Sequence, residues 1–168
     1  MDEPHHDSDL AIARIEAEVA ALELAHFDLD DAWWLGCYLR ERAARENLPI
    51  AIEIRRGVAT LFACLLPGAS ADNSEWLRRK LALVMRFERC TYALGLTFRR
   101  EPGLFERHGL DLRDHIADGG GVPIRLAGTG TIGALGISGL PQEDDHRLAI
   151  EALGALRAHQ ASCERTMA

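Results

Sequence analysis

The chain is short of cysteine pairs, aromatic residues and long apolar runs, and these shortages exclude several classes of protein. Its cysteines, Cys37, Cys64, Cys90 and Cys163, form no CxxC pair and no Cys/His pattern with metal-ligand spacing. We therefore predict reduced thiols, no disulfide framework and no metal site. No apolar run approaches the roughly 20 residues that span a bilayer, and no secretory signal pattern is present. These absences predict a cytoplasmic protein without membrane contact.

Positive charge is also scarce. Asp and Glu total 26 against 19 Lys and Arg, which gives a formal net charge of −7. This acidic excess argues against nucleic acid as a partner, because phosphates attract basic surfaces. The length of 168 residues and the 48% hydrophobic content suit one globular domain. We predict a flexible N-terminal tail over 1–9, one domain over 10–160 and a C-terminal tail over 161–168.

Hydrophobic periodicity predicts the element order ααββαββα. The predicted helices cover about 9–24, 28–48, 74–93 and 141–156, and the predicted strands 50–55, 58–66, 122–126 and 131–138. Alternation in the first strand predicts one buried face, whereas the second strand is apolar on both faces and is predicted to be more central. Asp72 and Glu75 have the spacing of a capping box before the long helix. Because the strands come as hairpins, we predict the α+β class, with a single-domain antiparallel sheet flanked by helices.

Two glycine-rich segments have different interpretations. The segment 128–133 matches the GxGxxG dinucleotide pattern, but a poor helix former follows it, so we predict a hairpin there. Gly119, Gly120 and Gly121 lead into a strand and form either a structural turn, which we favour, or a backbone loop that faces a ligand. His108 and His115 lie near Asp111 and Asp114 without metal-ligand spacing, which predicts a solvated loop.

Two charged residues fall on helix faces that are otherwise apolar. At about 100° per residue, Lys80 lies inside the apolar arc of the long helix, and Asp145 lies inside that of the last helix. Charges on core faces are costly unless they are paired or functional. We therefore predict that Lys80 and Asp145 meet, flanked by Arg79 and Asp144.

Two roles for this predicted pair stay open. It is either a structural ion pair or a lysine stem reaching water, or it belongs to a polar pocket under Trp76 in which His146 exchanges protons. The candidate ligand-binding residues are Trp76, Arg79, Lys80, Asp144, Asp145 and His146. No recognised catalytic spacing is present, so no catalytic residue is assigned.

Five sequence blocks carry a family resemblance. They are Trp34-Leu35-Gly36; Asp72-Asn73 with Trp76 and Arg79-Lys80; Gly119-Gly120-Gly121-Val122-Pro123-Ile124; Ser138-Gly139-Leu140-Pro141; and Asp144-Asp145-His146. Together they resemble the small "heme-degrading domain" family related to the GlcG and HbpS proteins, over roughly residues 18–158. The chain departs from that pattern at Val122, where Phe is usual, and at 89–91, where a His and two Ser residues are usual.

The resemblance implies an antiparallel sheet flanked by helices, a homo-oligomeric assembly, and haem binding or haem-linked sensing. The leading hypothesis is a cytoplasmic homo-oligomer that binds haem or another small ligand near Trp76, Lys80 and His146. A second hypothesis is a non-catalytic scaffold or interaction module, in which the same residues only fix the fold. A third is a small-molecule enzyme that uses Asp145 and His146 as an acid–base pair.

Overall fold

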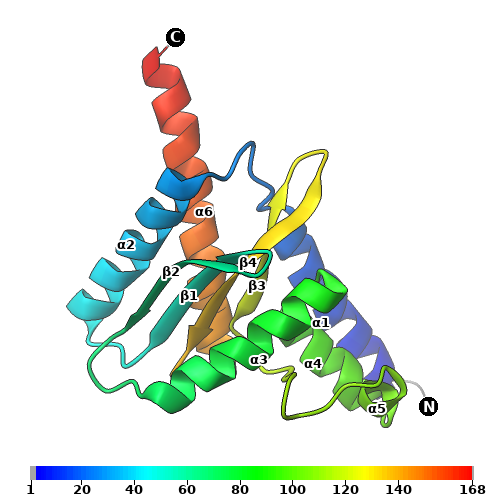
Figure 1. Cartoon of the computed structure of the whole chain (residues 1–168). Coiled ribbons are helices and arrows are strands. Elements are labelled where there is room, and N and C mark those ends of the chain that lie inside the picture. Colours follow the sequence, from blue (N-terminus) through cyan, green and yellow to red (C-terminus); the bar gives the residue numbers. More distant parts are fainter. Residues whose placement is uncertain (1–2, 168) are drawn as a thin grey trace.

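The computed structural model describes residues 3–167 and has six helices and four strands there (Figure 1). The elements are α1 (Glu3–Ala20), α2 (Leu29–Glu46), β1 (Ala51–Arg56), β2 (Ala59–Leu65), α3 (Ala71–Phe87), α4 (Thr91–Arg100), α5 (Leu104–Arg107), β3 (Gly121–Leu126), β4 (Gly130–Ser138) and α6 (Gln142–Met167). None of the helices in this range is both long and apolar enough to cross a bilayer.

The strands form one antiparallel sheet in the order β2-β1-β4-β3. Helices α2 and α6 pack on one face, and α3 crosses the other (Figure 1). The predicted α+β class and the two predicted hairpins are confirmed. The GxGxxG segment forms the β3–β4 turn and part of β4, with positive φ angles at Gly128 and Gly130, as the hairpin interpretation requires.

Two predictions about the first hairpin are wrong. Strand β1 is buried on both faces, because Ala51 and Glu53 are covered as well as Ile52 and Ile54. Strand β2 is not the more central strand but a sheet edge whose residues are exposed or half-buried. In this hairpin, the strand with apolar residues on both faces, β2, is the incompletely covered edge. The strand with the alternating pattern, β1, is the one that is covered on both faces.

The helix boundaries also differ from the predicted ones. Helix α3 ends at Phe87 because Glu88 adopts the left-handed conformation with φ 54°, and α4 is a separate helix. The side chain of Asn73 accepts a hydrogen bond from the Ser70 amide at 2.9 Å, so the cap precedes the predicted Asp72. Helix α1 begins at Glu3 and α6 continues to Met167, so both helices extend into the segments that we predicted as tails.

The two edges of the sheet are treated differently. At the β3 edge, the Leu24 amide donates to Arg125 O at 2.9 Å and Leu24 O accepts from the Ala127 amide at 3.0 Å. Pro123 lies in this edge strand, a position that suits a residue without an amide hydrogen. Among the described residues, no segment covers β2 in the same way.

Candidate functional site

Lys80 from α3 and Asp145 from α6 meet beneath one end of the sheet. Their side chains are 3% and 2% exposed, and Lys80 Nζ lies 3.1 Å from Asp145 Oδ2. The predicted pairing of these two charges is confirmed. Burial lowers the pKa of Lys80 and raises the pKa of Asp145, while the attraction between the two charges opposes both shifts.

The remaining hydrogen-bonding capacity of this pair is used by the main chain. Lys80 Nζ also donates to Gly119 O at 2.6 Å and to Ile137 O at 3.0 Å. The Asp145 carboxylate accepts from the Leu140 amide at 3.1 Å and from the Gly139 amide at 3.4 Å. The pair therefore ties α3 to the end of β4, to the 119–121 segment and to the start of α6.

The 119–121 glycines are needed where the main chain passes this pair. Gly120 has φ +118°, and a Cβ atom there would lie 2.3 Å from Ile137 O and 2.9 Å from Lys80 Nζ. Any other residue at position 120 would have a strained backbone, and its Cβ atom would clash with these two atoms. This close approach supports the structural interpretation of the triple glycine.

A pocket of about 450 Å³ opens above the ion pair. We name it the Ser138 pocket, and its lining residues are Asn73, Trp76, Lys80, Asp118, Ser138, Gly139, Leu140, Gln142 and Asp145. Within the described residues, neither the Ser138 hydroxyl nor the Asp118 carboxylate makes a hydrogen bond, and the Asp118 charge acts on Lys80, whose pKa it raises against the effect of burial. Because Lys80 and Asp145 neutralise each other, Asp118 leaves the lining with one net negative charge.

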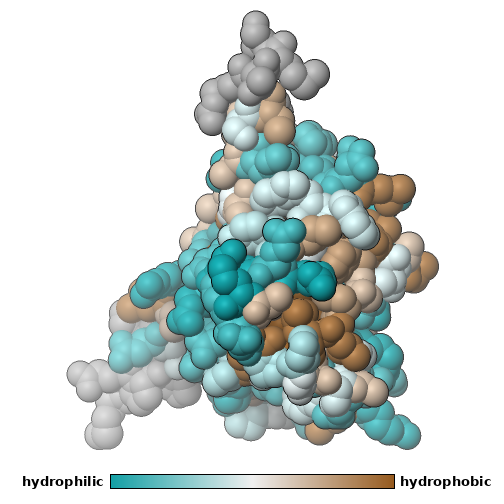
Figure 2. Space-filling view, turned by 90° about the vertical axis from the view of Figure 1, so that its left-hand side faces the viewer, coloured by the Kyte–Doolittle hydropathy of each residue, from teal (hydrophilic) through white to brown (hydrophobic). Residues whose placement is uncertain are grey.

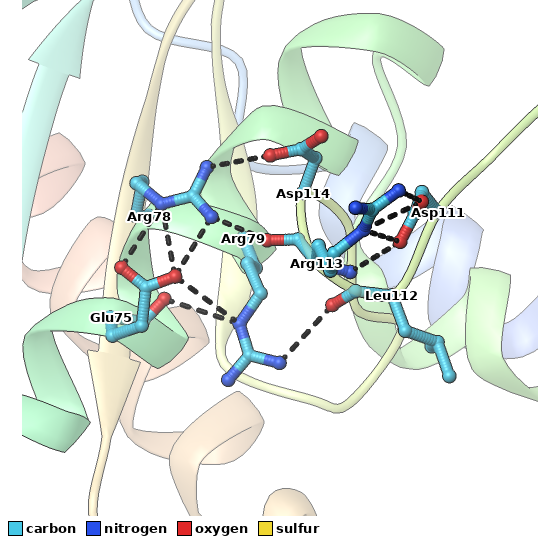
Figure 3. Close-up of polar contacts among 7 residues, drawn as sticks. All are labelled: Glu75, Arg78, Arg79, Asp111, Leu112, Arg113 and Asp114. Carbon is cyan, nitrogen blue, oxygen red and sulfur yellow. Dashed lines mark hydrogen bonds and ion pairs between the residues drawn. The ribbon is translucent and has the colours of Figure 1, made fainter.

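Arg79 and Asp144 do not flank the pair. Arg79 donates to Leu112 O at 3.3 Å and stacks on the Trp76 ring, 4.8 Å from its centroid. Figure 3 shows Arg78 and Arg79 reaching from α3 to the 111–114 segment, which they hold beside the helix. Asp144 pairs instead with Arg147 at 2.5 Å. The predicted flanking roles are therefore wrong.

His146 lies outside the Ser138 pocket. It is 5% exposed, and its ring lies against Tyr92 with the centroids 5.0 Å apart. Neither ring nitrogen has a hydrogen-bond partner in the described part of the chain, and burial lowers the pKa of His146 to about 4. Since consecutive helix residues point about 100° apart, Asp145 and His146 face different surroundings and form no acid–base pair.

Six pocket residues were absent from the predicted set, and four of these have polar side chains: Asn73, Asp118, Ser138 and Gln142. Asn73 and Ser138 lie within the sequence blocks of the family resemblance, which carried the only signal for them. Asp118 follows a charged, irregular segment without periodicity, and nothing in that pattern distinguishes it from a solvated side chain.

His26, Asp28 and Asp31 form a cluster with metal-ligand geometry, but they already bond to one another. Asp31 accepts from His26 Nδ1 at 2.9 Å and from the Asp28 amide at 2.9 Å, and its other oxygen accepts from Gln160 at 3.0 Å. Asp28 is the N-cap of α2. The cluster therefore fixes the start of α2 and its contact with α6.

The fold and the pocket together define a class, a single-domain α+β protein with a polar pocket built over a buried ion pair. The chain belongs to the family described as "Haem degrading protein HbpS-like", whose model matches residues 27–154. It is 44% identical over 147 residues to a UPF0303 protein of Edwardsiella ictaluri, covering 87% of this chain and 94% of that protein. It is 46% identical over 149 residues to a UPF0303 protein of Paraburkholderia phymatum, covering 88% and 90%.

Solved structures share the fold. The Ybr137w protein superposes with a TM-score of 0.83 at 27% identity, covering 89% of each chain. A structure described as a PduOC:Heme complex gives a TM-score of 0.65 at 25% identity, covering 77% of this chain and 94% of that one. The structure of HbpS gives a TM-score of 0.63 at 20% identity, covering 78% of this chain and 89% of that one. This likeness supports the fold alone.

The family description raises the question of whether haem fits this chain. Haem iron is held by His, Cys, Met or Tyr side chains, and none of these lines the Ser138 pocket. The haem propionates would also meet the negative charge of Asp118. The Ser138 pocket therefore does not fit haem.

Proposed function

We propose that the protein is a cytoplasmic homo-oligomer that binds a small polar ligand, neutral or cationic, in the Ser138 pocket. The observation that carries the proposal is that the Ser138 hydroxyl and the Asp118 carboxylate line the same pocket, and neither makes a hydrogen bond to another described residue. Both groups are therefore available to the polar groups of a ligand. A volume of about 450 Å³ lies within the range of small-molecule sites.

The lining supports this ligand chemistry. Asp118 accepts hydrogen bonds from hydroxyl or amino groups, and Ser138 both donates and accepts. Trp76 offers an aromatic surface at the pocket rim, held in place by a hydrogen bond from its Nε1 to Asp72 at 3.2 Å. The saturated Lys80–Asp145 pair supplies no free donor for an anionic ligand. Binding without turnover is the activity that these groups support.

The test is a protein-observed NMR titration with three probes: methyl glucoside, 1,4-diaminobutane and succinate. We expect saturable shifts of the Trp76 indole signal with the polyol or the diamine and none with succinate. Asp118→Asn should weaken the binding by at least about tenfold, since hydrogen bonds to charged groups contribute more than about 1.5 kcal/mol. Glu143→Gln, a change to an exposed carboxylate outside the pocket, is the matched control. Equal affinity in both variants would reject the site.

A haem titration is the complementary measurement. We expect no saturable change of the Soret absorbance with the wild-type chain, because the Ser138 pocket offers no axial ligand. A saturable Soret change that Trp76→Ala removes, in a variant with an unchanged circular dichroism spectrum, would contradict the proposed ligand class and favour haem.

The scaffold hypothesis makes the opposite prediction for these titrations. If the Lys80 region only fixes the fold, no probe should shift the Trp76 signal at any concentration. The homo-oligomeric part of the proposal draws support from exposed apolar side chains, among them Leu29 at 60%, Trp33 at 65% and Leu65 at 49%.

A further inference from the structure

Strand β2 presents one uncovered edge. Its inner side pairs with β1, and its outer side pairs with no described strand. Proteins usually protect such an edge with charged side chains, proline, short length or a covering segment. The seven residues of β2, Ala-Thr-Leu-Phe-Ala-Cys-Leu, contain neither a charge nor a proline. The β3 edge, in contrast, has both Pro123 and the Leu24 segment.

Apolar side chains flank this open edge. Trp33 of α2 is 65% exposed and meets the Phe62 ring of β2 edge-on, with the centroids 5.9 Å apart. The Phe62 ring lies directly against Gly36, where a Cβ atom would be only 2.3 Å away. Leu65 at the end of β2 is 49% exposed. Figure 2 shows hydrophobic side chains gathered beside a hydrophilic cluster on the side of the molecule that carries α2.

Opposite charges lie at the two ends of the same stripe of α2. Asp30 and Arg40 lie three residues before and seven after Trp33, which places all three on one helix face. Both are exposed, and neither forms an ion pair with a described residue. Burial raises the pKa of the Cys64 thiol in β2, and the positive charge of Arg40 opposes this rise. Arg40 therefore lies close to the β2 edge.

We propose that a second copy of this chain pairs its β2 antiparallel with β2 about a two-fold axis, which joins the two sheets into one of eight strands. A two-fold axis makes an interface self-complementary and reverses the direction of both β2 and α2. The uncharged strand then meets an uncharged strand without like-charge contact. Arg40 of one copy faces Asp30 of the partner subunit, and the Trp33 side chains are covered. This charge complementarity is what selects a second copy as the occupant.

The test measures mass by sedimentation velocity over a range of concentrations. Ala63→Lys places a charge on the exposed strand and should weaken association by at least about tenfold. Val58→Lys adds the same charge at the fully exposed hairpin turn and should leave association unchanged. A wild-type chain that is monomeric at all concentrations, or equal association of both variants, would overturn the proposal.

Charge reversal on α2 tests the orientation, with substitutions on an exposed helix face that leave the fold intact. Arg40→Glu and Asp30→Arg should each weaken association. If the two charges face each other, the double variant should associate at least about tenfold more tightly than either single variant. Failure of the double variant to recover would exclude the antiparallel arrangement. The inference specifies the oligomer of the proposed function. Its failure leaves the NMR titration of the Ser138 pocket unaffected, so the two proposals fail separately.

Discussion

Replacing Lys80 with methionine is expected to lower the free energy of unfolding by about 3–5 kcal/mol, the range for breaking one partner of a buried pair. Asp145, with a side chain only 2% exposed, would lose its counter-ion. The carbonyl groups of Gly119 and Ile137 would lose a donor at the same time. Urea denaturation of the variant and the wild type at pH 7 measures the difference.

Arg79→Met is the matched control, because it removes a neighbouring positive charge that lies outside the buried pair. It should cost much less, since partly exposed ion pairs contribute only about 0–1 kcal/mol. The double change Lys80→Met with Asp145→Leu should recover part of the stability, but the Leu140 amide would remain unsatisfied. A loss below about 1 kcal/mol for Lys80→Met would contradict a charged pair at this position.

Acid should destabilise the protein through His146. Burial lowers the folded-state pKa of His146 to about 4 from its usual value of 6.5, so the unfolded chain binds the proton more readily. Stability should therefore fall as the pH decreases from about 6.5 to about 4, by about 3 kcal/mol in total at 1.36 kcal/mol for each pH unit. His146→Leu should remove this part of the pH dependence, which urea titrations at several pH values measure.

His108→Gln provides the comparison, because His108 is exposed in the 101–110 segment. Its stability curve should follow the wild-type curve across the same pH range. A wild-type curve that is flat between pH 6.5 and 4, or that His146→Leu leaves unchanged, would show that His146 finds a partner or water in solution. Its two unpartnered ring nitrogens are the structural basis of the expectation.

The parts of this structure that were predictable from the sequence are those in which a pattern has one physical solution. When a lysine and an aspartate each lie inside an apolar helical arc, burying them costs least free energy if they form an ion pair. Lys80 and Asp145 form this pair. Strands separated by short glycine-containing turns pair as hairpins, which leads to the antiparallel sheet.

Other parts depend on contacts that a local pattern does not encode. Ile52 and Glu53 are both buried because helices cover both faces of β1, and alternation alone predicts one covered face. The end of α3 depends on the left-handed conformation of Glu88, a residue type with no preference for it. Asp118 enters the pocket because Arg78 and Arg79 hold the preceding 111–114 segment beside α3.

The composition of β2 has a consequence for how the protein behaves when it is made or diluted. Short segments with high β-propensity, no charge and no proline are the kind that nucleate amyloid-like stacking when they are exposed. The segment 59–65 meets each of these conditions. A folded monomer therefore exposes a segment that can aggregate. Rapid and complete assembly of the proposed dimer would cover this segment and keep the protein in solution.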